Sequence, residues 1–157
     1  MRRTASPDLV SDEYANLAVA RRLMRRYLAF SERAAASAGL EPQQYQLLLM
    51  LRGLTAHGAA SVADLADWLQ VRHHSAVGLV DRMQARELVE RRSDRTDRRR
   101  VVVTLTPKGE SALVRLAIVH RDELRRLAPA LVMSLSQIID HQPTDPVPEL
   151  ALHNPVT

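Results

Sequence analysis

The chain has 157 residues and a formal net charge of +4, and 46% of its residues are hydrophobic. This length and hydrophobic content suffice for a folded domain and argue against general disorder. The sequence contains no cysteine, which excludes disulfides, thiolate metal sites and cysteine redox sensing. It also lacks an apolar run of membrane-spanning length and the apolar core of a signal peptide, so we expect a soluble cytoplasmic protein with no membrane partner.

The first part of the chain reads as a flexible arm over residues 1–10, followed by a long helix from Ser11. Gly39 is a plausible residue to end this helix. Pro42 fits the first position of a second helix, which we expect to end between Gly53 and Gly58. Apolar residues mark one face of the first helix, and arginines mark the other: Tyr14, Leu17, Met24 and Leu28 against Arg21, Arg22, Arg25 and Arg26.

Two short apolar patterns then follow each other, each with the i, i+3, i+4, i+7 spacing of an amphipathic helix. Ser61 and Asp64 have the spacing of a capping box at the start of the first of these helices. Only about four residues, Gln70 to His73, separate the pair, which predicts a helix-turn-helix. The apolar positions are Val62, Leu65, Ala66 and Leu69, then Ala76, Leu79, Val80 and Met83.

A β-hairpin and more helices complete the predicted elements. Residues 88–92 and 101–106 read as the two strands of a β-hairpin, joined by an arginine-rich turn. Thr106 and Pro107 predict a helix start, and this helix should run to about Leu127. Pro129 is expected to interrupt it before a last short helix, and the proline-rich residues 141–157 read as a flexible tail. The apolar residues of the last helix are Leu131, Leu135, Ile138 and Ile139.

Over about residues 12–140 the sequence resembles the MarR family of bacterial winged helix-turn-helix transcription regulators. Four blocks carry this resemblance: residues 79–83 (LVDRM), 88–92 (LVERR), 97–103 (DRRRVVV) and 105–109 (LTPKG). It implies a mainly α-helical domain over 11–140 with a small β-wing. The winged helix would span about 40–106, and helices at about 11–38 and 107–140 would form a dimerisation base. The apolar stripes on those terminal helices also favour a homodimer, because they have no other obvious place to be buried.

Two positions depart from the family pattern. Glu87 stands where the family commonly has glycine, so the turn into the wing has to hold a non-glycine residue or take another geometry. Arg72 stands where the recognition helix usually has a serine-like cap.

Helix geometry turns the residues between the apolar positions of the second short helix outward, where a recognition helix meets base edges. Gly78 would allow a close approach to DNA. His73 and His74 are adjacent and point about 100° apart, so they make a poor chelate, and we expect neither a metal nor another cofactor. Ser61 is expected to cap its helix and could also contact a phosphate.

The arginine-rich turn is either a solvated loop or a DNA-binding wing, and arginine is favoured in a narrow minor groove. By resemblance to the family, Arg99 enters the minor groove, Asp97 braces it, and Arg98 or Arg100 lies near phosphates. The predicted DNA contacts are Ser61, Arg72, His73, His74, Ser75, Val77, Gly78, Arg82, Arg95, Asp97, Arg98, Arg99 and Arg100.

The predicted function is a sequence-specific regulator of transcription that binds double-stranded DNA as a homodimer on a pseudo-palindromic operator. We expect it to act as a repressor. By resemblance, a small aromatic or lipophilic anion would release it, with Arg26, Tyr27 and Tyr45 as candidate ligands. No phosphate loop or nucleophile motif supports an enzyme. The alternatives are a nucleoid-type protein that coats DNA without sequence preference and a winged helix that binds other proteins.

Overall fold

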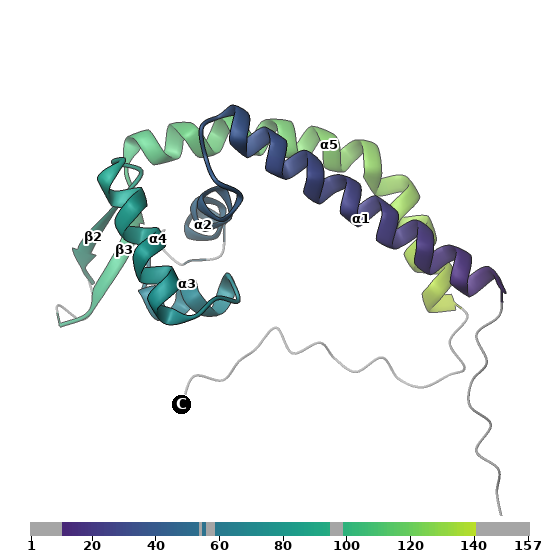
Figure 1. Ribbon diagram of the computed structural model, residues 1–157, viewed down its shortest axis with the longest axis horizontal. Helices are drawn as coiled ribbons and strands as arrows, with labels where there is room; N and C mark the ends of the chain where they lie inside the picture. The colour runs from purple at the N-terminus through teal and green to yellow at the C-terminus, as the bar shows by residue number, and fades with distance from the viewer. Residues whose placement is uncertain (1–10, 54, 56–58, 95–98, 141–157) are drawn as a thin grey trace, which may run out of the picture. The chain divides into compact units, whose positions relative to one another are not determined.

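The computed structural model describes residues 11–53, 55, 59–94 and 99–140 (Figure 1). The predicted arm (1–10) and tail (141–157) lie outside these described residues. Within them the protein is mainly helical, with one small antiparallel sheet, as the sequence predicts. The elements are α1 (Ser11–Ser37), α2 (Pro42–Gly53), β1 (Ala59–Ala60), α3 (Val62–Trp68), α4 (His73–Ala85), β2 (Val89–Ser93), β3 (Val101–Leu105) and α5 (Pro107–Asp140).

The described residues form two compact units. The larger unit, residues 25–127, contains α2, α3, α4 and the sheet together with the end of α1 and the first part of α5. The smaller unit joins the start of α1, up to Met24, to the end of α5, from Ala128 onward.

A single hydrophobic core holds the larger unit together. The apolar faces of α2, α3 and α4 meet β2 and β3 there, and Figure 1 shows these elements grouped around α2. Trp68, which the sequence places off the strict apolar face of α3, packs against this core while partly buried. The largest side chains with almost no exposed surface are Leu47, Leu48, Leu51, Leu65, Leu79, Met83, Val80, Val89 and Val103.

The sheet has the order β1-β3-β2, and both pairings are antiparallel. The predicted hairpin is confirmed: its register runs from Val89 opposite Leu105 to Ser93 opposite Val101. The strand β1 was not predicted. It has two residues, which pair with Thr104 and Val103, and a strand this short leaves no alternating pattern in the sequence.

The expected interruption at Pro129 is wrong, because α5 continues through this residue as one helix. Proline removes one backbone N–H donor and crowds the carbonyl of the preceding turn, at a cost of ~3 kcal/mol in a helix interior. Leu127 and Ser134, on either side of the proline, are almost fully buried.

Three helices end in the same way, with a residue of positive φ just past the last turn. Gly39 follows α1 at φ 70°, Gln70 follows α3 at 54°, and Glu87 follows α4 at 59°. In each case the next N–H reaches back to the carbonyl five residues earlier, for example from Leu88 to Met83 at 3.0 Å. These are Schellman motifs. Glu87 therefore takes the conformation that glycine would provide.

Candidate nucleic-acid interface

The helix α4 presents two different faces. Ala76, Val80 and Met83 are fully buried in the core, with Leu79 1% exposed. On the first turn His73, His74 and Ser75 are exposed, and Val77 and Gly78 further along are half-buried. The structure therefore separates a packing face from an outward face as the periodicity predicts, and the predicted base-contacting residues lie on the outward face.

The two helices of the pair begin differently. At α3, the Oγ of Ser61 accepts the Asp64 N–H at 3.2 Å, and the Asp64 carboxylate accepts the Ser61 N–H at 2.9 Å, so the predicted capping box is confirmed. The Ser61 hydroxyl also donates to Asp64 Oδ2 at 2.6 Å, so both hydrogen-bond donors of Ser61 are used within the cap. At α4, Arg72 is the N-cap residue, and its side chain makes no capping hydrogen bond.

The base of the wing is tied to the recognition helix. The guanidinium of Arg91 on β2 donates to the Asp81 carboxylate at 2.6 Å and to the side-chain carbonyl of Gln84, both on α4. Arg86, which follows the last residue of α4, donates to the Gly39 carbonyl at 2.7 Å and to Gln44 at 2.9 Å. These contacts fix how the recognition helix lies against the hairpin and against the link between α1 and α2.

The outer part of the wing is described only in part. Arg95, Asp97 and Arg98, all predicted DNA contacts, lie outside the described residues. Arg99 and Arg100 are exposed, and the Arg100 guanidinium lies 3.3 Å from the Asp64 carboxylate. Arg82, on the outward side of α4, lies 3.8 Å from the Glu41 carboxylate with more than half of its side chain exposed.

Two of the three candidate ligand residues, Tyr27 and Tyr45, contact a buried histidine on the packing face of α5. His120 on α5 is 2% exposed, and its ring stacks on Tyr45 with 4.2 Å between ring centroids. The edge of Tyr27 meets the same ring at 6.2 Å. A lone histidine on an apolar stripe gives no sequence signal for a site, because such residues usually serve packing.

Hydrogen bonds indicate which nitrogen of the His120 ring carries a hydrogen. Nδ1 lies 2.7 Å from the Leu116 carbonyl, which can only accept, so Nδ1 carries a hydrogen. Nε2 lies 2.9 Å from the Ser31 hydroxyl, which donates to it when the ring is neutral. Burial, with a smaller effect from Tyr27, raises the pKa of the Tyr45 phenol to about 12, and burial also raises the pKa of Tyr27. Both phenols are therefore protonated at neutral pH and can serve as donors.

A buried carboxylate lies one turn further along α5. Glu123 is 7% exposed, and it lies 3.1 Å from Arg126 and 3.9 Å from Arg26. Arg26 thus has an anionic partner inside the protein, while 58% of its side chain is still exposed. The structure brings Tyr27 and Tyr45 together on His120 and places Arg26 beside Glu123.

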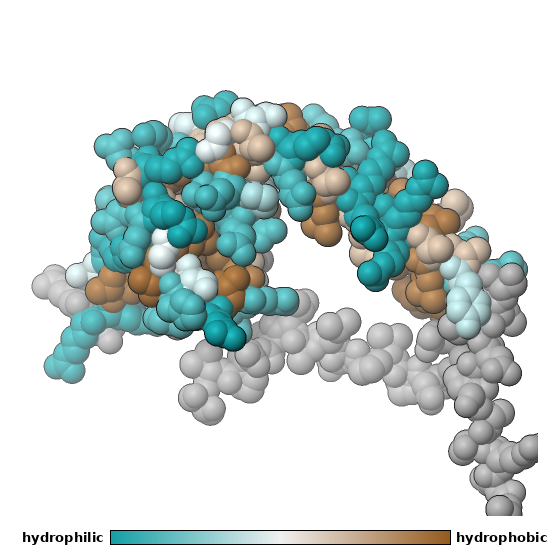
Figure 2. Space-filling view, in the orientation of Figure 1, coloured by the Kyte–Doolittle hydropathy of each residue, from teal (hydrophilic) through white to brown (hydrophobic). Residues whose placement is uncertain are grey.

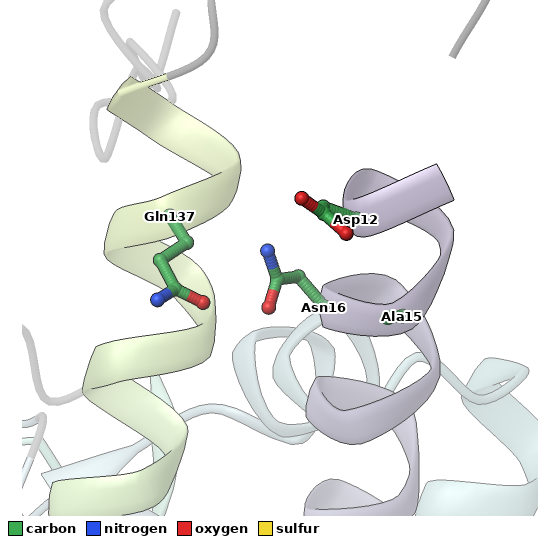
Figure 3. Close-up of a pocket in the computed structure, with 4 residues that line it drawn as sticks. All are labelled: Asp12, Ala15, Asn16 and Gln137. Atoms are coloured by element: carbon green, nitrogen blue, oxygen red, sulfur yellow. The ribbon is translucent and has the colours of Figure 1, made fainter. Parts of the chain in front are cut away.

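The smaller unit contains a separate, open pocket of about 320 Å³. Asp12 and Asn16 of α1 point toward Gln137 of α5 across it, with Ala15 on the same wall (Figure 3). None of these residues is among the predicted contacts. Across the described ranges, no three His, Asp or Glu side chains are arranged to hold a metal ion. In the same ranges, no helix is both long and apolar enough to cross a bilayer.

Comparison with known proteins gives consistent matches. Residues 38–100 match a model of the MarR family. The transcriptional repressor NicR of Pseudomonas putida is 36% identical over 93 residues, which make up 59% of this chain and 57% of NicR. The transcriptional activatory protein BadR of Rhodopseudomonas palustris is 38% identical over 77 residues, 49% of this chain and 44% of BadR. The chain thus spans about half the length of these curated relatives.

A solved structure extends the similarity to most of the chain. It is that of BpsR from Bordetella bronchiseptica, and it concerns the regulation of DNA binding by 6-hydroxynicotinic acid. The two chains superpose with a TM-score of 0.57 and 25% identity, over 87% of this chain and all of that one.

Proposed function

Because the chain belongs to the MarR family, we propose that it is a transcription regulator that binds double-stranded DNA in a sequence-specific way. The observation that carries this proposal is the arrangement of α4. Its outward face, with His73, His74 and Ser75 on the first turn, lies in the same packed unit as an arginine-rich hairpin anchored to it through Arg91. A helix enters the major groove and a basic wing follows the neighbouring minor groove in this mode of binding.

The proposal includes a homodimer, repression and a cytoplasmic location. A two-fold dimer presents two recognition helices about one helical turn, or ~34 Å, apart, which corresponds to a pseudo-palindromic site. Repression is favoured over activation by the similarity to NicR, whose matched segment is longer than that of BadR. A transcription regulator of this kind is not an enzyme. We place it in the cytoplasm because bacterial DNA lies there.

The direct test is selection of duplexes from a random-sequence pool with the purified protein. We expect a pseudo-palindrome bound at least about 10³-fold more tightly than a scrambled duplex. Equal affinity for both duplexes would instead indicate a nucleoid-type protein. No binding to either would favour the protein-interaction alternative. A reporter gene placed behind the selected sequence then separates repression from activation.

We further propose that a small aromatic or lipophilic anion binds at the cluster of Arg26, Tyr27, Tyr45 and His120 and weakens DNA binding. Tyr27 and Tyr45 supply two protonated phenols on the His120 ring, and Arg26, which lies 3.9 Å from Glu123 with 58% of its side chain exposed, supplies a cation; these groups suit a planar carboxylate. BpsR, whose DNA binding is regulated by 6-hydroxynicotinic acid, supports this class of ligand.

The ligand proposal is tested with 6-hydroxynicotinate, benzoate and decanoate as probes. A hit should raise the melting temperature and release the selected duplex; a 100-fold loss of affinity corresponds to about 2.7 kcal/mol of coupling. Arg26→Gln should abolish the response, whereas Arg22→Gln, an exposed residue of the same helix, should retain it. If no probe both stabilises the protein and releases DNA, control by protein abundance becomes the better explanation.

A further inference from the structure

The Asp64 carboxylate is a junction between the start of α3 and the wing. Its Oδ2 atom lies within hydrogen-bond distance of three donors: the Ser61 N–H at 2.9 Å, the Ser61 hydroxyl at 2.6 Å and the Arg100 guanidinium at 3.3 Å. The first two contacts complete the helix cap. The third is not needed for capping, and it reaches a residue 36 positions away in the sequence.

Arg100 stands where the hairpin turn joins β3. Its carbonyl accepts the Asp94 N–H at 2.8 Å, which closes the outermost described turn of the hairpin. Its side chain points back to Asp64. The segment just before Ser61 is also joined to the hairpin, because β1 pairs with β3 at Ala60 and Val103. Main-chain pairing therefore holds the inner end of β3 near α3, and the Asp64–Arg100 contact is a side-chain tie at its outer end.

We propose that Asp64 is a positioning residue for DNA binding: by holding Arg100, it sets the direction in which the wing leaves the helix-turn-helix. This inference rests on the proposed function. In this role Arg100 serves the wing's geometry, and it is not itself one of the phosphate contacts. The wing and the recognition helix must engage neighbouring grooves at the same time, so a wing that points elsewhere loses affinity even when every contacting arginine is present.

Electrostatics alone predicts the opposite result for Asp64. A carboxylate close to a polyanion weakens binding, and its removal should therefore tighten binding. Asp67 offers a matched comparison: it lies on the same helix, one turn further on, and it is exposed. Within the described part of the chain, the Asp67 side chain makes no hydrogen bond or ion pair. The same Asp-to-Asn change at the two positions thus separates positioning from charge.

The experiment measures the affinity of Asp64→Asn and Asp67→Asn for the duplex selected by the wild-type protein, by fluorescence anisotropy over a range of salt concentrations. We expect Asp64→Asn to bind about threefold more weakly, the range that an exposed ion pair allows. Asp67→Asn should bind as tightly as the wild type or more tightly. The side-chain carbonyl of asparagine at the third helical position can still accept the Ser61 N–H, so Asp64→Asn should keep its fold.

Arg100→Gln completes a double-mutant cycle. We expect a loss of about threefold for this variant as well, no further loss when both substitutions are combined, and an unchanged salt slope. A direct phosphate contact would instead reduce the slope by about one unit. If Asp64→Asn has a lower melting temperature than the wild type, the salt dependence of DNA binding by Arg100→Gln still tests the inference. That variant leaves the capping box intact.

Two results would overturn the inference: tighter binding by Asp64→Asn, as for the Asp67 control, or a shallower salt slope for Arg100→Gln. Failure of the proposed function looks different, because the wild-type protein would then select no sequence at all.

Discussion

Gly78 is a glycine that the fold itself does not require. A Cβ built at this position would come no closer than 3.6 Å to any neighbour, and that neighbour is the flexible end of the Arg82 side chain. Gly109 is the contrasting case, because a Cβ there would lie 1.9 Å from the Leu88 carbonyl oxygen where α5 starts against the hairpin. The glycine at position 109 is explained by packing, whereas the fold would also accept alanine at position 78, where the proposed binding mode brings DNA close to α4.

We therefore predict opposite effects of Gly78→Ala on stability and on DNA binding. The free energy of unfolding should rise by ~0.5–1 kcal/mol, because glycine is unfavourable in a helix interior. Affinity for the selected duplex should fall about tenfold, within the roughly 1–3 kcal/mol of a disturbed base contact. Chemical denaturation and anisotropy titration measure the two quantities.

Gly53→Ala serves as the control for this prediction. Gly53 closes α2, and a Cβ added there would meet nothing within 4 Å, so alanine at this position should leave DNA affinity unchanged. Unchanged affinity in Gly78→Ala would show that DNA does not approach the backbone of α4 at this residue.

Among the elements, the wing carries the largest expected share of the electrostatic binding energy. We predict that Arg99→Ala weakens DNA binding more than Arg121→Ala and reduces the salt slope by about one unit, because in the proposed binding mode the wing meets DNA and Arg121 lies outside it. Arg121 is an exposed residue of α5 that lies 3.1 Å from Asp122. Circular dichroism should first confirm that both variants are folded. An Arg99→Ala variant with wild-type affinity and slope would exclude engagement of the wing tip.

The elements also show what a sequence can reveal. The helices α3 and α4 were predictable because each has its own apolar periodicity, and Ser61 with Asp64 marks a helix start through local chemistry. The hairpin was predictable from its β-branched run at 101–104 and from the turn that precedes it. The continuity of α5 was not predictable, since a proline inside a helical pattern usually ends or kinks the helix. The strand β1 exists only through its pairing with β3.

In the candidate site, too, some features were predictable from local sequence and others were not. Periodicity alone identified the outward face of α4. By contrast, His120 joins Ser31, Tyr45 and Tyr27 from two other helices, and the Asp64–Arg100 contact spans 36 positions. Such contacts depend on tertiary packing, and no local sequence pattern predicts them.

At the scale of the whole molecule, the terminal helices expose more apolar surface than a monomer would be expected to leave in water. Figure 2 shows apolar surface on α1 and α5 in the described part of the chain. Isolated exposed apolar residues are ordinary, but an extended set on two helices supports the proposal of a dimer interface. The exposed side chains on these helices include Tyr14, Leu17, Met24, Leu28, Leu124, Val132, Met133, Leu135 and Ile139.

We predict a homodimer at micromolar concentration in sedimentation velocity. Val132→Glu should weaken dimerisation by at least about 100-fold, because an unpaired charge buried in an interface costs several kcal/mol. Val101→Glu is the matched control: Val101 is 55% exposed and Val132 60%, but Val101 lies in the wing. That variant should remain dimeric. A wild-type protein that sediments as a monomer would contradict the prediction.

The left-handed residues at Gln70 and Glu87 bear on how this protein can evolve. The first closes α3 just before the turn and the second closes α4, so the segment between them has locked ends. One inserted or deleted residue would rotate everything beyond it by about 100° around the helix axis, and either the apolar face or the closing bonds would be lost. New DNA preferences can therefore arise here by exchanging side chains at fixed length. Variation in length has to be confined to other parts of the chain.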